Sequence, residues 1–370
     1  MIAAEERTGS NVTTLELFFD LVFVFVITQL STLLAHDLTW DGVGHVALML
    51  GLIWFMYGGY AWLTNAIDVG TPVNRAFLLA GMCGYFVIAL AVPQAFGEDA
   101  GLAFGVGYLV VVLVHTGLFV TSAPGLAPQA ILRLAPGNLG NATLVLVGGA
   151  LGGTTQTVLW TISVVAIWVI PKLVGNQDFS VAPAHFVERH GLVIIVAIGE
   201  SVVAVGIGAA GLPVDAELVL FAVTGLLLSA SLWWTYFGGD DERAEQALQQ
   251  LPTRARAAAA LDGYGFAHYA LLLGIVFAAV GLKSATGHAY DASTTGEAAI
   301  LAGGAALFLA GDVWFRRVLR IVEGTAARAL AAVVVLATIP LGTEVAAIAQ
   351  VAALAAVVAT AATGRLPTAR

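Results

Sequence analysis

Long apolar runs recur along the whole chain, and they limit its possible folds more than any other feature. A transmembrane helix needs about 20 mostly apolar residues to cross the hydrocarbon core. Runs of that length alternate with short polar stretches, and only 11% of the residues are charged, against about a quarter in soluble globular domains. We therefore predict an all-α, polytopic helical membrane protein with about twelve transmembrane helices. The expected spans are residues 15–35, 43–67, 73–93, 100–122, 130–150, 155–173, 189–210, 216–237, 258–282, 298–320, 326–341 and 344–363.

Two neighbouring pairs of spans leave the number of helices open. Only a few small or polar residues divide 130–150 from 155–173 and 326–341 from 344–363, so eleven or thirteen helices are alternatives. The basic residues give an orientation, because Lys and Arg concentrate in cytoplasmic loops. With a cytoplasmic N-terminus and twelve spans, every Lys and Arg except Lys283 falls on the cytoplasmic side. We therefore expect both termini in the cytoplasm.

Twelve spans divide naturally into six plus six. Two halves with an even number of spans would be parallel repeats related by an axis along the membrane normal. The expected halves are residues 1–174 and 188–370, joined by a cytoplasmic linker at 175–187. At an offset of 172 residues Glu16 aligns with Glu188, but identities at this offset are close to chance, so the repeat is predicted from span count and orientation.

Two acids lie one helical turn apart at the start of the first span. Glu16, Asp20 and Ser31 share one stripe of a helix, because a helix turns by about 100° per residue. Glu16 is shallow enough to act at the helix N-terminus, with Thr13 or Thr14 as the capping residue. Asp20 lies one turn deeper, and carboxyls inside a bilayer need a partner, a proton or water. We expect Asp20 to face an inward polar site.

Two stretches resemble the signatures of a known family. Residues 16–31, ELFFDLVFVFVITQLS, resemble the opening signature of the bacterial low temperature requirement protein A family, and residues 188–201, ERHGLVIIVAIGES, resemble its mid-chain signature. The resemblance implies an integral protein of the bacterial inner membrane, in a family with no settled biochemical activity. His190 stands where many members are expected to carry an aromatic such as Phe. The positions carried over are Glu16, Asp20, Gln29, Glu188, Arg189, Gly199, Glu200 and Ser201.

Glu200 is the deepest acid of the second signature. It stands about eleven residues into its span, roughly 16 Å deep in a ~30 Å core. Arg189, near the cytoplasmic mouth, cannot easily reach it, so Glu200 needs another partner or a proton. One interpretation is a protonated acid that joins neighbouring helices by a hydrogen bond, and the other is a site that exchanges protons. We predict that Asp20 and Glu200 face a common polar cavity, with Gln29, Ser31 and Ser201 as lining groups.

Other polar side chains within spans are secondary candidates. Asp262 and His268 belong to a polar helix that could border a cavity, and we include both in the predicted binding site. Asp312 and Arg316 have the i,i+4 spacing of a local ion pair. Cys83 lies in an apolar span, where a packing role is expected.

Three classes of function fit these patterns. The leading prediction is a secondary transporter or permease with a carboxyl-lined, proton-coupled site for a small solute. The second is a membrane-embedded enzyme or haem-like cofactor carrier, for which His115 and His268 are the histidines placed well within spans. The third is a non-catalytic scaffold or sensor. We expect the lipid bilayer as a partner, and no cofactor, metal or nucleic acid; the sequence does not determine the oligomeric state.

Overall fold

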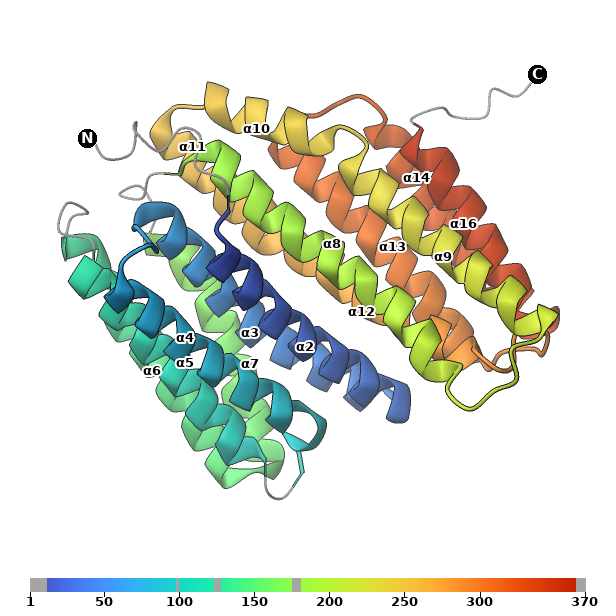
Figure 1. The fold of residues 1–370 in the computed structure, drawn as a ribbon, viewed down its shortest axis with the longest axis horizontal. Helices are drawn as coiled ribbons and strands as arrows, with labels where there is room; N and C mark the ends of the chain where they lie inside the picture. The colour runs from blue at the N-terminus through green and yellow to red at the C-terminus, as the bar shows by residue number, and fades with distance from the viewer. Residues whose placement is uncertain (1–11, 98–99, 123–127, 175–180, 364–370) are drawn as a thin grey trace. The chain divides into compact units, whose positions relative to one another are not determined.

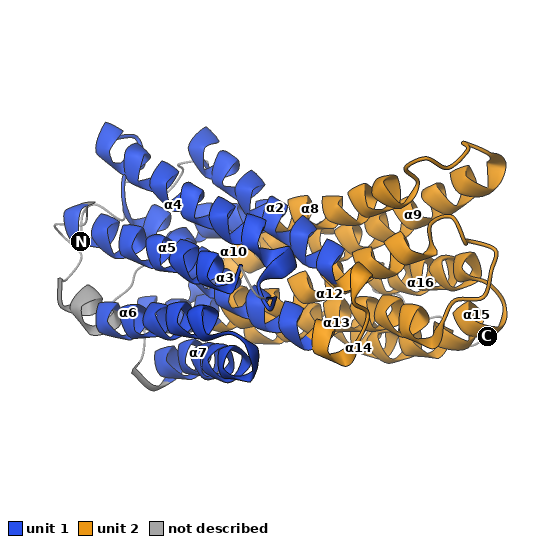
Figure 2. Cartoon of the chain, turned by 90° about the horizontal axis from the view of Figure 1, so that it is seen from below, with its two compact units in different colours: residues 1–33, 44–192, 248–261 blue, residues 34–43, 193–247, 262–370 orange. Residues whose placement is uncertain are grey.

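The structure is a computed structural model, and it describes residues 12–97, 100–122, 128–174 and 181–363. Long helices make up nearly all of these residues, and the described part contains no β-strand (Figure 1). The prediction of an all-α protein is therefore confirmed. The chain divides into two compact units, coloured separately in Figure 2: unit 1 comprises residues 1–33, 44–192 and 248–261, and unit 2 comprises residues 34–43, 193–247 and 262–370.

Unit 1 is built mainly from the first six long helices and the first turns of the seventh. In this unit α4 packs on α5, α5 on α6, and α6 on α7. The contact between α5 and α6 is close because Gly149 lies directly against the backbone of Gly101, where a Cβ would not fit. The helices are α2 (Thr14–His36), α3 (Trp40–Ala66), α4 (Pro72–Ala91), α5 (Gly101–Ser122), α6 (Pro128–Leu151), α7 (Gly153–Val174), α8 (Pro183–Gly208) and the short α11 (Thr253–Ala260).

The first doubtful pair of spans is divided by two glycines. Gly152 and Gly153 have φ angles of +67° and +56°, a left-handed conformation that glycine adopts without steric cost. The chain therefore reverses between Leu151 and Gly153, and the two helices form an antiparallel hairpin. Trp160 donates its Nε1–H to the carbonyl of Val145 at 2.9 Å, which joins the two helices further along.

Unit 2 is arranged around α13. This helix packs on α12, α14 and α16, and α16 also packs on α9. Gly274 and Gly304 allow the backbones of α12 and α13 to approach closely. The remaining elements are α9 (Ala216–Phe237), α10 (Asp240–Gln250), the π-helical turn η2 (Leu261–Ala267), α12 (His268–Ala285), α13 (Thr295–Val318), α14 (Thr325–Val334), the 3-10 turn η3 (Val335–Thr338), α15 (Ile339–Glu344) and α16 (Ala347–Ala362).

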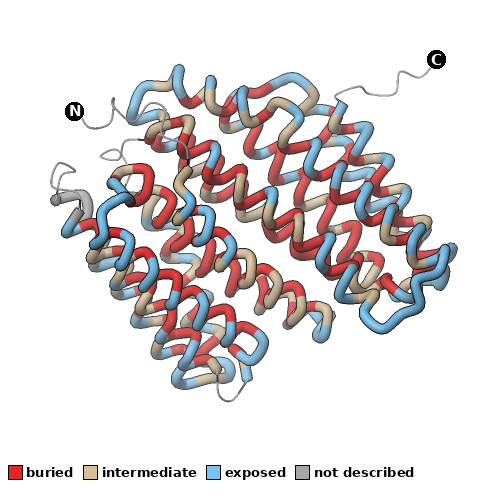
Figure 3. The backbone as a smooth tube through the Cα atoms, in the orientation of Figure 1, coloured by how far each residue is buried: buried red, intermediate tan, exposed pale blue. Residues whose placement is uncertain are grey.

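Each predicted span falls on a helix. Among the described residues, ten helical segments are long and apolar enough to cross a membrane. The other two spans correspond to α6, which contains Pro136, and to the shorter apolar helix α16. Buried residues follow one stripe of most helices (Figure 3), yet the exposed faces are apolar too, as on α9 with Leu220, Val223 and Leu227. Helices that are apolar all round fit lipid as their solvent, so the chain is a polytopic helical membrane protein.

Two expectations about single side chains were wrong. Cys83 does not pack in a core, because it is exposed on the outer face of α4. Asp312 and Arg316 take partners from other helices: Asp312 Oδ2 accepts from Arg328 Nη1 at 2.9 Å, and Arg316 Nη1 donates to Asp240. Asp312 and Arg316 do lie four residues apart on one helix, but each of them pairs with a buried residue of a neighbouring helix.

Candidate functional site

Arg189 of α8 lies between the two acids of α2 in unit 1. Its Nη2 is 3.0 Å from Asp20 Oδ1, and its Nη1 is 3.6 Å from Glu16 Oε1. All three residues are only 1% exposed. The two acids reach one guanidinium because they lie one helical turn apart on the same face of α2, so the four-residue spacing seen in the sequence positions both carboxylates.

Glu16 also caps the N-terminus of α2, which begins at Thr14. The Glu16 N–H donates to Thr13 Oγ1 at 3.3 Å, and Glu16 Oε2 accepts the Thr13 N–H at 2.9 Å. These two bonds form a capping box, which satisfies backbone donors at a helix N-terminus. The expected capping role of Glu16 beside Thr13 is therefore present, and the same carboxylate takes part in the buried ion cluster.

His185 of α8 completes the surroundings of Glu16. Its Nε2 lies 3.2 Å from Glu16 Oε1. Asn65 of α3 holds the ring: its Oδ1 accepts the Ala182 N–H at 2.9 Å, and its Nδ2 is 3.3 Å from His185 Nδ1. Because an amide nitrogen can only donate, Nδ1 accepts and Nε2 carries the hydrogen that points to Glu16. The geometry therefore favours a neutral His185.

Asp20 receives fewer hydrogen bonds than Glu16. Tyr57 of α3 donates its hydroxyl to Asp20 Oδ1 at 2.9 Å, on the oxygen that Arg189 also contacts. Asp20 Oδ2 is buried and has no hydrogen-bond partner among the described residues. The rings of Phe19 and Tyr57 lie 5.6 Å and 5.7 Å from the Arg189 guanidinium carbon, within the range of a cation–π contact.

The charges of this cluster do not balance without a proton. Two carboxylates, Glu16 and Asp20, surround one guanidinium, and His185 is neutral in the tautomer that Asn65 favours. A net charge buried away from water is costly. A proton on Asp20 Oδ2 would neutralise the cluster. We call Glu16, Asp20, Tyr57, His185 and Arg189 the acid–arginine cluster.

His190, in the second signature, lies among aromatic side chains. Its Nδ1 lies 2.8 Å from the carbonyl oxygen of Phe186, and its ring packs at 4.3 Å from the ring of Phe186, with Trp54 and Tyr57 at its edge. The imidazole therefore occupies an aromatic environment, where a ring of another type would also fit.

The other predicted site residues are distributed over both units. In unit 1 Gln29 is half-buried, and the buried Ser31 donates its hydroxyl to the Thr28 carbonyl at 3.0 Å. In unit 2 Glu200 and Ser201 are 2% and 1% exposed, and the Ser201 hydroxyl has no hydrogen-bond partner within the described chain. A cavity common to Asp20 and Glu200 stays a prediction.

His268 sits directly after the π-helical turn of unit 2. Its Nδ1 is 2.8 Å from the Gly263 carbonyl oxygen, and its Nε2 is 2.8 Å from the Tyr236 hydroxyl. Tyr264 stacks on the ring at 4.8 Å. Both ring nitrogens are thus engaged in hydrogen bonds, while Asp262 is half-buried in the same turn. Within the described residues no group of three His, Cys, Asp or Glu side chains could hold a metal ion.

Sequence reasoning missed Tyr57 and Asn65 as members of the site. They lie eight residues apart, on one face of α3, and each supplies a polar group to a side chain of another helix. An asparagine and a tyrosine at this spacing in an apolar span indicate a polar face on α3. Only the structure shows that this face meets α2 and the start of α8.

Comparisons with known proteins agree with the two signatures. An uncharacterised protein of Rhizobium meliloti (strain 1021) is 29% identical over 322 residues, which cover 82% of this chain and 76% of that protein. No solved structure matches the chain. Residues 11–363 match the family described as bacterial low temperature requirement A protein (LtrA). The chain therefore belongs to the LtrA family.

Proposed function

We propose that this protein is a proton-coupled secondary transporter of the bacterial cytoplasmic membrane, with the acid–arginine cluster as its proton-binding site. The observation that carries the proposal is the pairing of two buried carboxylates with a single guanidinium inside helices of transmembrane length. Ionisable groups in such helices are costly and commonly belong to substrate or proton pathways.

The unequal hydrogen bonding of the two acids supports Asp20 as the residue that binds the proton. Glu16 accepts from the Thr13 backbone and faces His185 and Arg189, so its ionised form is well supported. Asp20 has one oxygen in contact with Tyr57 and Arg189 and one with no partner among the described residues. Asp20 therefore holds the exchangeable proton, and Arg189 pairs with Glu16 whichever form Asp20 takes.

The solute site is proposed to include Glu200. Arg189 and Glu200 belong to one continuous helix, α8, so a change in the charge of the cluster acts on the helix that carries Glu200. Gln29, Ser31 and Ser201 remain candidate lining groups, and the Ser201 hydroxyl, which has no hydrogen-bond partner among the described residues, supports a polar ligand beside it. Alternating access would follow the pattern of transporters with parallel repeats.

Proton flux in proteoliposomes tests the proposal. The full chain is reconstituted with a trapped pH-sensitive dye, and pools of small solutes are added outside. We expect at least one pool to drive proton movement, and Asp20→Asn and Glu200→Gln to abolish it without a large change in melting temperature, because each amide resembles the protonated acid.

The matched control is Asp37→Asn, which makes the same chemical change at an exposed position just beyond the far end of α2. This variant should keep the flux of the unaltered protein. The proposal is wrong if no pool moves protons, or if Asp20→Asn transports as well as Asp37→Asn.

A further inference from the structure

A buried acid at the start of α10 joins three arginines in unit 2. Asp240 is 1% exposed; its Oδ2 accepts from Arg316 of α13 and from Arg328 Nη1 of α14, the latter at 2.5 Å. Its Oδ1 accepts from Arg243 Nη1 at 3.1 Å. One carboxylate therefore holds three guanidinium groups close to each other at the ends of their helices.

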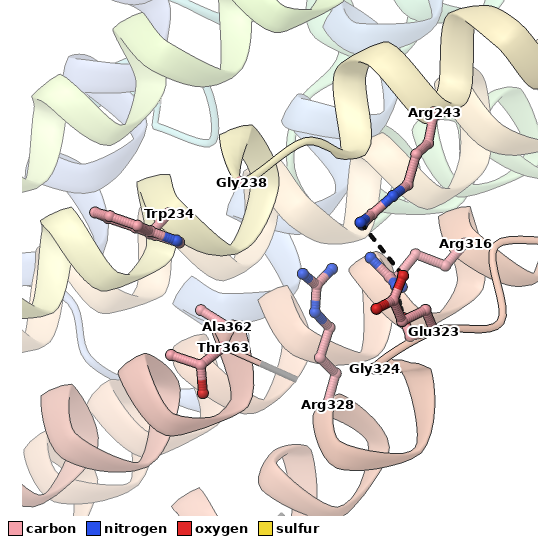
Figure 4. Close-up of a pocket in the computed structure, with 9 residues that line it drawn as sticks. All are labelled: Trp234, Gly238, Arg243, Arg316, Glu323, Gly324, Arg328, Ala362 and Thr363. Carbon is pink, nitrogen blue, oxygen red and sulfur yellow. Dashed lines mark hydrogen bonds and ion pairs between the residues drawn. The ribbon is translucent and has the colours of Figure 1, made fainter. Parts of the chain in front are cut away.

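These arginines line a cavity of about 590 Å³. Figure 4 shows the guanidinium groups of Arg243, Arg316 and Arg328 directed toward one another, with Glu323 beside them. The volume is in the range of small-molecule sites. The other lining residues are Trp234, Gly238, Gly324, Ala362 and Thr363.

The arginines differ in how many of their N–H groups make hydrogen bonds. Arg316 is fully engaged, with Nε on Thr325 Oγ1 at 3.0 Å, Nη1 on Asp240 and Nη2 on the Glu323 carbonyl oxygen. Arg328 is 3% exposed, and its Nη1 contacts Asp240 and Asp312, but its buried Nε has no hydrogen-bond partner in the described part of the chain. Arg328 thus lines the cavity and keeps one buried donor unused among the described residues.

A helix N-terminus opens on the same cavity. Gly324 is the N-cap of α14, with φ of +72°, and it offers no side chain to cap the helix. The Thr325 N–H donates to the Val322 carbonyl at 3.2 Å, so only the N–H groups after it are candidates for a ligand. Uncapped N–H groups and the positive end of the helix dipole together favour an anion. The spare Arg328 donor and this N-terminus are independent features of one cavity.

The acid nearest to the opening is easily displaced. Glu323 Oε2 lies 3.4 Å from Arg243 Nη2, and the Glu323 side chain is 83% exposed. An exposed pair of this length contributes little stability. A multiply charged anion could take the place of this carboxylate and contact Arg243 without disturbing Asp240.

We infer that this cavity binds a phosphate group, either that of an anionic phospholipid or that of a free phosphate. Arginine and helix N-termini are the usual partners of phosphate oxygens. Trp234, 59% exposed, borders the cavity at the end of the apolar helix α9, as expected at a membrane–water interface. This site is separate from the acid–arginine cluster and does not depend on transport.

Binding measurements on the full detergent-solubilised chain test the inference. Native mass spectrometry with phosphatidylglycerol, with phosphatidylcholine and with inorganic phosphate separates the two sources. We expect retention of phosphatidylglycerol over phosphatidylcholine if the source is lipid, and a rise in melting temperature with inorganic phosphate if the free anion binds. If neither probe binds, the inference is overturned.

Three variants locate the site. Arg243→Gln should weaken binding roughly tenfold or more, as expected for a lost charge-assisted hydrogen bond. Glu323→Gln, at an exposed position that does not endanger folding, should strengthen binding by removing the competing carboxylate. Arg317→Gln makes the same charge change at an exposed position beside Arg316 but outside the cavity, so it should leave binding unchanged. Equal effects of Arg243→Gln and Arg317→Gln, or no gain from Glu323→Gln, would contradict the assignment.

Discussion

A single guanidinium organises the acids that the sequence brings into the first span. The capping role of Glu16 could be predicted because Thr13 and Glu16 are three residues apart, which is a local pattern. The partner of Asp20 could not, because Arg189 is far away along the chain and nothing local to either residue indicates the contact. The spacing of the acids predicted a shared face, and the structure shows which cation that face meets.

The first prediction concerns the energy of this cluster. Removing one partner from a buried ion pair typically costs about 3–5 kcal/mol, because the remaining charge is stranded. Arg189→Gln should therefore lower the melting temperature strongly in detergent. The triple variant Glu16→Gln, Asp20→Asn, Arg189→Gln should recover much of the loss, because no charge is left unpaired. If the melting temperature of the triple variant falls by the sum of the decreases in the three single variants, the three residues are not coupled.

At the scale of elements, periodicity and run length predicted the helices well. The spans match helices because each helix satisfies its own backbone hydrogen bonds within one apolar run. The turns between helices and the irregular turns within them were harder to predict. The turn between α6 and α7 depends on the φ angles of Gly152 and Gly153, in a stretch that contains several other glycines, and the π-helical turn at Leu261–Ala267 has no marker in the hydropathy.

The second prediction tests the turn between α6 and α7. Gly152→Ala places a Cβ on a left-handed residue, which costs about 1–2 kcal/mol. Gly140→Ala is the matched control, because Gly140 is exposed within α6 and a Cβ there meets no other atom. Thermal unfolding should show a lower melting temperature for Gly152→Ala and an equal or higher one for Gly140→Ala. The reverse order would mean that the turn is not left-handed.

At the scale of the whole molecule, the six-plus-six repeat stays a prediction. In unit 1, Gln156 near the start of α7 donates to the Ala95 carbonyl at 2.6 Å, shortly before α5. In unit 2, Gln350 near the start of α16 donates to the Ala298 carbonyl at 2.8 Å, in the first turns of α13. In the first half this bond joins the start of the last long helix to a residue just after η1 (Val92–Gln94), and in the second half it joins the start of the last long helix to the first turns of the fourth. The expected linker at 175–187 lies partly outside the described residues.

The third prediction follows from the predicted parallel orientation of the two halves. In a Cys83→Ser background, single cysteines are placed at four exposed positions: Asp41, Asp68, Gln246 and Asp291. A membrane-impermeant maleimide should label Asp41→Cys and Asp291→Cys in intact cells, and Asp68→Cys and Gln246→Cys only after permeabilisation. Protection of Asp291→Cys in intact cells would rule out the arrangement.

The protonation of Asp20 is the most direct test of the proposed function. Infrared difference spectra of the reconstituted protein between acidic and alkaline pH report the carbonyl stretch of a protonated carboxyl. We predict that the unaltered protein and Asp37→Asn show this signal from a buried group, and that Asp20→Asn lacks it. A signal that persists unchanged in Asp20→Asn would contradict the assignment of the exchangeable proton to the acid–arginine cluster.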